Sequence, residues 1–316
     1  MRGISRTSKM QRARGHPGKV KARVFGETAD KASTLRIFTV SCLSRLIGFA
    51  RRISGAKAIK FTKTKLFLRS FQESIAIGVF RRSEILHAVE QSYGDAPEFY
   101  APENYVTQVE NELLPTLEEL ASGKQLLDLY AGQGREAEIF AEAGYNVVCV
   151  DRVSESVELG RKRAAGKPFK ATFLVADIED PAWQPPTEEW DVVYTSLWML
   201  STIPNREHRA VWLERLQSFG NENSLFVVSA TLRRNEKLAS LRHVWTRILR
   251  VLSFNSREIE FGDYFSSGIF WHEFLDKEVR DEINAAGFEI LADYESHDKN
   301  VPTCNFYFLR RRHGAK

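Results

Sequence analysis

Apolar positions follow two different patterns along this chain, and the second begins near residue 103. From there, short apolar runs that read as buried strands are separated by stretches with helical spacing. The predicted strands are 124–130, 146–151, 171–177, 190–196 and 224–230. The predicted helices are 104–121, 134–144, 153–165, 205–219 and 275–286. Strands that alternate with helices in this way form a parallel sheet with right-handed crossovers.

The last part of the chain departs from this alternation. Two strand patterns, 288–296 and 305–311, follow the final helix and are joined by a short link. A short link favours antiparallel pairing. The predicted fold class is therefore α/β: a seven-stranded, mostly parallel sheet with a C-terminal antiparallel hairpin, in a domain that spans 96–316.

The first 95 residues carry the other pattern. An apolar stripe with helical spacing recurs at steps of three and four through Leu35, Phe38, Cys42, Leu46, Phe49 and Ile53. A second helix is predicted near 82–92. We interpret 33–95 as a basic amphipathic helical extension. Residues 1–32 have little to bury and are predicted to be a basic disordered tail.

Composition narrows the class of protein. Of the 316 residues, 43% are hydrophobic and 27% are charged, which is close to the globular average. No apolar run approaches the roughly 18–20 residues of a membrane-spanning helix. The three cysteines lie far apart and show no metal-ligand spacing, so no metal site is predicted. Reduced thiols favour a reducing compartment, and we expect a cytoplasmic protein.

Charge is distributed unevenly along the chain. Residues 1–70 carry 18 Lys and Arg against two acids, a net charge of +16, although the whole chain is only +4. The remainder is accordingly −12. The sequence therefore predicts a basic arm in front of an acidic body, and each must be considered by itself.

Four interpretations of residues 1–70 remain open. A basic amphipathic helix can lie on an anionic membrane surface. Lys and Arg interleaved with Phe can bind RNA through phosphates and stacking. An acid-poor N-terminus rich in Arg and Ser is also typical of an organellar transit peptide. The stripe can finally dock on the acidic body. The membrane surface is ranked slightly above RNA because the apolar stripe is continuous.

The most informative segment runs from Leu126 to Arg135. A buried strand ends near Asp128, and a Gly132-Gln133-Gly134 turn then opens a helix. Glycines let a ligand approach the backbone closely, and a helix N-terminus offers free N–H groups. The next two strands end at Asp151, where a carboxylate can accept ribose hydroxyls, and at Asp177-Ile178. In an open parallel sheet, ligands bind at this edge.

These motifs resemble the class I S-adenosylmethionine (SAM)-dependent methyltransferases over about residues 100–312. The resemblance implies a Rossmann-like sheet, SAM as cofactor and a fourth motif at 191–196. It implies cofactor contacts at Asp128, Tyr130, Ala131, Gly132, Gly134, Asp151, Arg152, Asp177, Ile178, Thr195 and Ser196. The Gly-Gln-Gly-Arg motif at 132–135 is similar to that of tellurite-resistance-type and other small-molecule methyltransferases. One departure is Tyr130, where the family usually has glycine; this side chain can crowd or stack beside the methionine end of the cofactor.

A nicotinamide dinucleotide site is the competing interpretation. Gly132-x-Gly134-x-x-Ala137 with Asp151 downstream also satisfies a dinucleotide-binding fingerprint. Asp128 is out of place in that fingerprint, and the terminal strand pair is typical of the methyltransferase fold. A catalytically silent module that binds SAM or a partner also stays open, because a fold does not fix a function.

Methyl transfer from a sulfonium is an in-line displacement, so the protein must mainly position the acceptor and exclude water. A general base is needed only for an acceptor that is protonated near neutral pH. Tyr194 and His272 are the candidate catalytic residues, and a hydrogen-bonded structural role is the alternative for His272. Trp198, Met199 and Trp271 can line a pocket or pack in the core.

The sequence narrows the acceptor only by exclusion. The fourth motif has no Asn-Pro-Pro-Tyr, and no Pro-Cys follows that strand, which disfavours exocyclic-amine and pyrimidine C5 methyltransferases. The expected acceptor is an oxygen or nitrogen of a small molecule or lipid, with an RNA methyltransferase as the alternative. The oligomeric state is left open.

The long segment 231–270 interrupts the predicted sheet. Its helix carries basic residues among apolar ones: Arg233, Arg234, Lys237, Arg242, Arg247 and Arg250. Two interpretations are equally weighted: a basic cap over an anionic acceptor, or a helix with a solvated charged face.

Overall fold

The structure is a computed structural model of the whole chain. It describes residues 62–81, 83–85, 88–89, 109–169, 171–187, 189–255, 258–297 and 303–312. The predicted tail at 1–32 and the apolar stripe at 35–53 lie outside the described residues. The same holds for the predicted boundary between residues 95 and 96.

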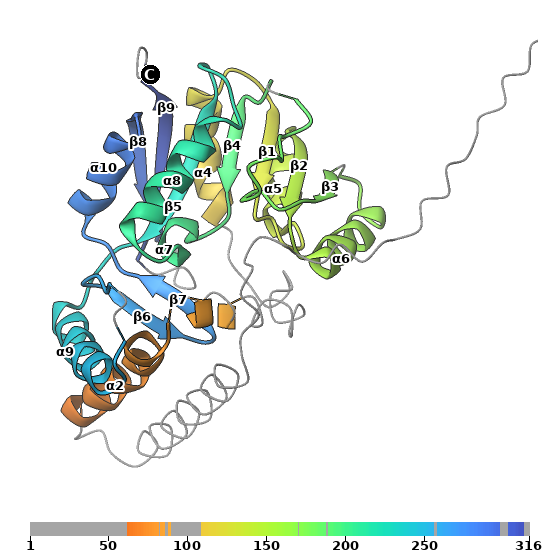
Figure 1. Cartoon of the computed structure of the whole chain (residues 1–316). Helices are drawn as coiled ribbons and strands as arrows, with labels where there is room; N and C mark the ends of the chain where they lie inside the picture. The colour runs from red at the N-terminus through yellow and green to blue at the C-terminus, as the bar shows by residue number, and fades with distance from the viewer. Residues whose placement is uncertain are drawn as a thin grey trace, which may run out of the picture.

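A seven-stranded sheet forms the centre of the molecule, in the order β3-β2-β1-β4-β5-β9-β8 (Figure 1). The strands from β1 to β5 run parallel, and β9 pairs antiparallel with both β5 and β8. This arrangement confirms the predicted fold class. The strands are β1 (Gln125–Leu129), β2 (Asn146–Asp151), β3 (Ala171–Val175), β4 (Val192–Thr195), β5 (Leu225–Thr231), β8 (Phe288–Glu295) and β9 (Cys304–Arg311).

Helices cover both faces of the sheet, because both faces carry buried apolar side chains. One apolar cluster joins the sheet to α4 (Val109–Leu120), α5 (Arg135–Glu142) and α6 (Ser154–Ala165). A second cluster joins the other face to α8 (Arg206–Gln217) and α10 (Asp276–Ala285). In Figure 1, α8 lies in front of the strands and α4 behind them. Side chains alternate along a strand, so neighbouring residues of β1 face different helices.

A separate unit, which we call the cap, lies at the edge of the sheet where β5 ends (Figure 1). It consists of α2 (Thr62–Val79), α9 (Glu236–Leu252) and the two-stranded sheet of β6 (Asp263–Ser266) and β7 (Ile269–His272). Its own apolar cluster includes Ile75, Ile77, Phe80 and Phe270. Gly78 allows helices α2 and α9 to approach closely, because it has no side chain. A Cβ at this position would lie only 2.5 Å from Leu249 Cβ.

The cap unites two parts of the sequence that the chain keeps far apart. Arg242 on α9 is 1% exposed and donates from Nε to Glu73 on α2 at 2.6 Å and from Nη1 to Glu273 at 2.8 Å. Its guanidinium lies 3.9 Å from the centre of the Tyr264 ring. Helix α2, from the predicted basic extension, is thus held against the 231–270 insert.

The β6–β7 hairpin is absent from the sequence prediction. Its two central residues, Ser267 and Gly268, have φ values of 55° and 81°. Two positive φ values in a two-residue loop are typical of the type I′ turn that joins antiparallel strands. In the sequence, the Ser267-Gly268 pair between two aromatic segments is the signal that could have predicted this turn.

Candidate active site

The turn between β1 and α5 is tight and held by backbone hydrogen bonds. Ala131 N donates to Val150 O at 3.1 Å, and Gly134 N donates to Ala131 O at 2.7 Å. Gly132 and Gly134 have φ values of 55° and 67°, in the left-handed region that favours glycine.

The two glycines serve different purposes. A Cβ on Gly134 would lie 2.6 Å from the Phe173 ring, so glycine is needed there for packing. A Cβ on Gly132 would meet nothing within 4 Å. The positive φ accounts for glycine at position 132, and the protein leaves open space over this backbone. This open space is what a closely approaching ligand requires.

Asp151, at the end of β2, lies directly beside this turn. Its Oδ2 accepts a hydrogen bond from Gly132 N at 2.8 Å, and its Oδ1 accepts one from Val153 N at 2.8 Å. Burial raises the pKa of this carboxyl, while the two backbone N–H groups oppose the shift. The carboxylate is thus fixed in orientation next to the open space, as a hydrogen-bond acceptor for ribose hydroxyls needs to be.

Asp177 and Ile178 follow β3 at the same edge. Ala176 N donates to Asp151 O at 3.0 Å, which ties the two strand ends together. Asp177 Oδ1 accepts from Glu179 N at 3.0 Å in a tight local turn. The Ile178 side chain is 5% exposed and packs in the core. Exposed Arg152 follows Asp151 at the start of the next loop.

Tyr130 occupies the position where glycine was expected, and it keeps the glycine-like backbone, with φ at 60°. Trp212 Nε1 on α8 donates to the Tyr130 hydroxyl oxygen at 2.7 Å. The ring packs against the core cluster beneath α8. Burial raises the pKa of the phenol, which therefore stays protonated. The side chain is anchored toward α8.

Asp128 differs from its predicted place at an accessible strand end. It lies inside β1 and is fully buried, because it shares the face of the strand that α4 and α5 cover. Its Oδ2 accepts from the Cys149 thiol at 3.8 Å, and Oδ1 has no hydrogen-bond partner among the described residues. Burial, reinforced by the negative charge of Glu136, raises its pKa well above the ordinary range. The Asp128 side chain thus faces the interior of the protein, toward Cys149 of β2.

A buried ion-pair network holds the first residue of α5 beside Asp128. Arg135 donates to both oxygens of Glu110 on α4, at 2.8 and 2.6 Å, and to Glu136 Oε1 at 2.8 Å. Ser196, after β4, donates to the same Glu136 oxygen at 3.0 Å. The network fixes the N-terminus of α5 at the glycine turn. Sequence reasoning missed Glu110 and Glu136, which carry no motif of their own.

Tyr194 and Thr195 are both fully buried. The Tyr194 hydroxyl donates to Glu110 Oε1 at 3.3 Å, and burial raises the pKa of the phenol well above its ordinary value. Thr195 Oγ1 donates to Val227 O on β5 at 3.1 Å. Both hydroxyls are used within the protein, so neither faces an acceptor in this arrangement.

The cap brings aromatic side chains to the carboxyl edge of β4. Trp198 begins the short helix α7 (Met199–Thr202), and its ring meets Trp271 of β7 edge-on, with centroids 5.7 Å apart. Trp271 in turn stacks with Tyr264 of β6 at 6.4 Å. All three side chains are partly exposed. They form an aromatic wall beside the strand ends that the sequence assigned to the cofactor.

His272, the other candidate catalytic residue, is fully buried on the side of β7 opposite to Trp271. Its Nδ1 lies 2.8 Å from Asp263 Oδ1, and its Nε2 has no hydrogen-bond partner among the described residues. Glu260, Asp263 and His272 offer ligand atoms within 4.8 Å of one another. Arg209 Nη2, however, donates to Glu260 Oε2 at 2.7 Å and already supplies a cation. The geometry is that of a hydrogen-bonded structural histidine.

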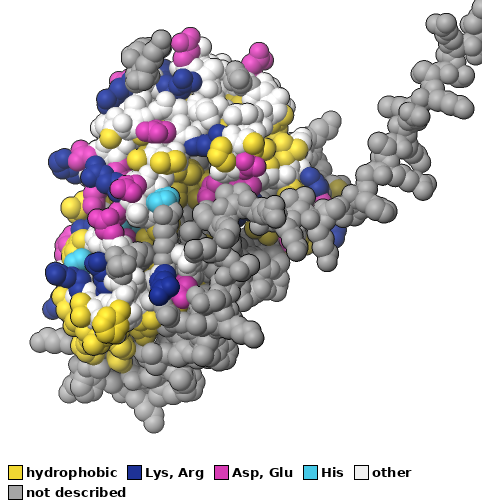
Figure 2. Space-filling model, viewed as in Figure 1, with side chains coloured by type: hydrophobic (Ala, Val, Ile, Leu, Met, Phe, Trp, Pro, Cys, Tyr) yellow, Lys and Arg dark blue, Asp and Glu magenta, His cyan; other side chains and the backbone are white. Residues whose placement is uncertain are grey.

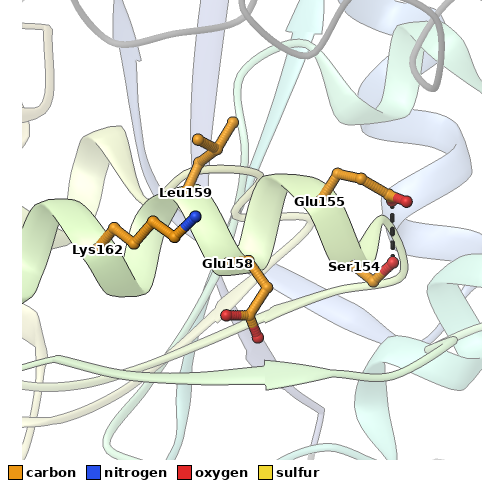
Figure 3. A pocket seen from close by; sticks show the side chains of 5 residues that line it. All are labelled: Ser154, Glu155, Glu158, Leu159 and Lys162. Atoms are coloured by element: carbon orange, nitrogen blue, oxygen red, sulfur yellow. Dashed lines mark hydrogen bonds between the residues drawn. The ribbon is translucent and has the colours of Figure 1, made fainter. Parts of the chain in front are cut away.

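A shallow hollow of about 380 Å³ lies on the outer side of α6 (Figure 3). It is lined by Ser154, Glu155, Glu158, Leu159 and Lys162. Helix α6 begins three residues after Asp151, but the hollow includes neither Asp151 nor Gly132. We give greater weight to the space over Gly132, where backbone geometry and a fixed carboxylate coincide.

Residues 126–218 match the family model of the methyltransferase domain. The match runs from β1 to the end of α8 and includes every residue to which the sequence assigned cofactor contacts. The cap and His272 lie outside it. No curated protein sequence matches this chain.

Solved methyltransferase structures share the fold. The 1,6-didemethyltoxoflavin-N1-methyltransferase of Burkholderia thailandensis is 16% identical, with a TM-score of 0.52, over 74% of this chain and 92% of that one. The CcbJ methyltransferase of Streptomyces caelestis is 13% identical, with a TM-score of 0.51, over 71% and 98%. A SAM-dependent methyltransferase of Methanosarcina mazei is 17% identical, with a TM-score of 0.50, over 63% and 97%.

Residues 126–218 therefore carry a methyltransferase domain, the class of domain whose methyl donor is SAM. The structure fits this cofactor at the glycine turn, where a bare backbone and the oriented Asp151 carboxylate adjoin. The nicotinamide interpretation is thereby set aside. Among the described residues, no helix is both long and apolar enough to cross a membrane.

Proposed function

We propose that Gly132, Asp151 and Asp177 hold SAM, and that the methyl group goes to an oxygen or nitrogen of a small molecule or lipid. The open space over Gly132 supports the first part. Asp151 accepts the ribose hydroxyls, and Asp177 lies near the adenine. Asp128, Tyr194 and Thr195 do not contact the cofactor in this proposal. Their side chains bind other parts of the protein, at Cys149 on β2, Glu110 on α4 and Val227 O on β5.

The proposed acceptor class rests on one observation, the aromatic wall formed by Trp198, Trp271 and Tyr264. Aromatic side chains offer large apolar contact area and suit a flat or apolar acceptor. Two arginines of the 231–270 insert are engaged within the protein. Arg242 is bound by two glutamates, and Arg233 donates to the carbonyl oxygens of Phe261 and Glu273. These two arginines serve the protein's own structure, so they do not support a phosphate-rich acceptor such as RNA at this site.

The chemistry asked of the protein is mainly positional. The cofactor supplies an electrophilic methyl group, so the chain must hold the acceptor atom in line and keep water out. Trp271 and Trp198 exclude water from one side of the space. His272 as general base stays a prediction, because its Nε2 is buried and would need to gain access to the acceptor. The narrower resemblance to tellurite-resistance-type enzymes rests on residues 132–151 and also stays a prediction.

Labelled methyl transfer tests the acceptor class. The full-length protein is incubated with methyl-labelled SAM and separate lipid, small-metabolite and RNA fractions of a cell extract. We expect label in the lipid or small-metabolite fraction. Label in RNA alone, or in no fraction, would contradict the proposed acceptor.

A matched pair of tryptophan variants tests the wall once an acceptor is found. Trp271→Phe should raise the acceptor KM by about two- to tenfold, since an aromatic contact contributes about 0.5–1.5 kcal/mol, and should leave SAM binding unchanged. Trp183→Phe is the control, because Trp183 also meets an aromatic neighbour edge-on, Phe219 at 5.3 Å, but outside the cap. Equal effects of the two substitutions would remove the wall from the acceptor site.

A further inference from the structure

The outer side of α9 exposes a group of large apolar side chains near its C-terminal end. We call this group the α9 apolar face; it consists of Val244, Ile248, Val251, Leu252 and Phe254. The positions 244, 248, 251 and 252 follow helical spacing, so these side chains share one side of the helix. Phe254, just past the helix, is 97% exposed. Figure 2 shows hydrophobic side chains gathered over this end of the cap, at the lower left.

This concentration is unusual within the described part of the molecule. Other exposed large apolar residues there are spread over separate elements, such as Leu159 on α6, Val211 on α8 and Leu275 before α10. Single exposed apolar residues are normal, but a contiguous group marks a surface that binds something. The buried side of α9 is already used against α2, so core packing does not account for the outer side.

The charge around this face points to the partner. Residues 237–257 contain no Asp or Glu, while they contain Lys237, Arg247 and Arg250. Lys237 and Arg247 are exposed on the same helix. The exposed acids Glu236 and Glu258 lie just outside this stretch. An apolar surface with basic side chains on the same helix complements an anionic lipid interface, where the apolar groups enter the acyl boundary and the cations meet the head groups.

Other occupants fit less well. A second copy of the chain would bring two acid-free, basic faces together. The apolar stripe at 35–53 is equally free of acids and carries Arg36, Arg45 and Arg51, so its docking here would also join like charges. Nucleic acid would match the charge, but among these five side chains only Phe254 offers a ring on which a base can stack.

We propose that the α9 apolar face docks the protein on an anionic lipid surface. In this docked state Val251, Leu252 and Phe254 enter the interface, and Arg247 contacts the head groups. The cap then lies between the membrane and the sheet, since the same unit carries Trp271 at the carboxyl edge of β4. The docking does not depend on the acceptor and goes beyond the proposed function, so a binding measurement tests it without methyl transfer.

Flotation with vesicles tests the docking in the full-length protein. Wild type should float with phosphatidylcholine vesicles that contain phosphatidylserine, and more weakly with pure phosphatidylcholine or in high salt. The triple substitution Val251→Ser, Leu252→Ser and Phe254→Ser should weaken binding by at least about tenfold, because three apolar side chains no longer leave water. Arg247→Glu should weaken binding to the anionic vesicles only.

Val211→Ser is the matched control, because Val211 is 64% exposed on α8, outside the cap. It should bind vesicles as wild type does. Thermal unfolding of each variant verifies that the fold is retained, which is expected for exposed positions. The proposal is overturned if wild type does not float, if the triple variant floats like wild type, or if light scattering shows that the substitutions dissociate a dimer while vesicle binding persists. RNA binding in place of vesicle binding would overturn it too.

Discussion

Gly132 and Arg242 mark two regions that were both expected to meet a ligand, and the structure treats them differently. At Gly132 the backbone is bare, and a Cβ would meet no atom within 4 Å. At Arg242 the side chain is 1% exposed and bound by two carboxylates of its own chain. One region leaves space over its backbone for something from outside, and the other uses its polar groups to join two helices.

The two regions also differ in how far apart their partners lie in the sequence. Gly132 and Asp151 are 19 positions apart, in successive strand–helix units. Arg242 and Glu73 are 169 positions apart, with the whole first half of the sheet between them. A composition rich in basic residues therefore did not reveal a ligand in the cap, because the neutralising acid comes from a distant segment.

Breaking the cap at its buried ion pair should have the largest effect. Glu73→Ala leaves Arg242 buried with one carboxylate fewer, and removing one partner of a buried pair costs about 3–5 kcal/mol. We expect that loss in the free energy of unfolding, measured by urea denaturation, with faster hydrogen exchange in α2 and α9.

A surface ion pair at the start of α9 provides the control for this substitution. Glu236 is 63% exposed and lies 3.8 Å from Arg233, so Glu236→Ala should cost at most about 1 kcal/mol. Binding of S-adenosylhomocysteine should change little in either variant, because the glycine turn lies outside the cap. Equal losses from Glu73→Ala and Glu236→Ala would show that the cap does not depend on the buried pair.

Closing the space over Gly132 should have the next largest effect, on affinity. Gly132→Ala places a methyl group where the cofactor approaches, and we expect S-adenosylhomocysteine to bind at least about tenfold more weakly by calorimetry, or about 1.4 kcal/mol. Gly144→Ala is the control, since Gly144 also has a positive φ, 88°, and a Cβ added there would likewise meet no atom within 4 Å.

Both substitutions carry a similar backbone strain of about 1–2 kcal/mol, which calorimetry of ligand binding does not report directly. A decrease in affinity confined to Gly132→Ala sharpens the assignment. The same decrease in both variants would attribute it to strain, and no decrease in either would move the cofactor away from this turn.

The smallest effect on stability is expected from substitution of Asp128. The informative measurement is how the free energy of unfolding depends on pH. Burial, with the negative charge of Glu136, raises the pKa of Asp128 well above 3.8 in the folded protein. The folded chain thus holds this proton more tightly than the unfolded chain does. Its contribution to stability is complete below about pH 3.8 and is lost as the pH rises through the raised pKa.

Asp128→Asn tests this because it keeps the shape and cannot titrate. The free energy of unfolding of the variant should differ from that of wild type by less than about 1 kcal/mol near pH 4. As the pH rises, the variant should become more stable relative to wild type. Urea denaturation without cofactor, repeated across pH, measures the difference. A constant difference at all pH values would mean that Asp128 titrates normally.

The strand–helix alternation made most of the sheet predictable. Each βα unit is local, and its apolar run, turn glycine and helix spacing lie within about 30 residues. The terminal strand pair was predictable for the same reason. The cap was less so: the Ser267-Gly268 turn was a readable signal, but the pairing of α2 with α9 depends on packing between distant segments.

The candidate site was predictable in part, for a related reason. The turn glycine and the strand-end carboxylate singled out Gly132 and Asp151, and the structure places these two residues in contact. Asp128, Tyr194 and Thr195 were expected at the site, but the strand alternation turns their side chains into the protein, where they bind Cys149, Glu110 and Val227 O. Residue type located the right strands, and burial decided which side chains can reach a ligand.

The amino-acid sequence alone determined the parallel sheet, its closing strand pair and the glycine turn, since these follow from apolar periodicity and from the backbone freedom of glycine. The tertiary structure decided that α2 completes the cap, that Arg242 of the insert is neutralised inside it and that His272 is enclosed. Those outcomes depend on which distant side chains become neighbours, and in a folded chain close packing sets the neighbours.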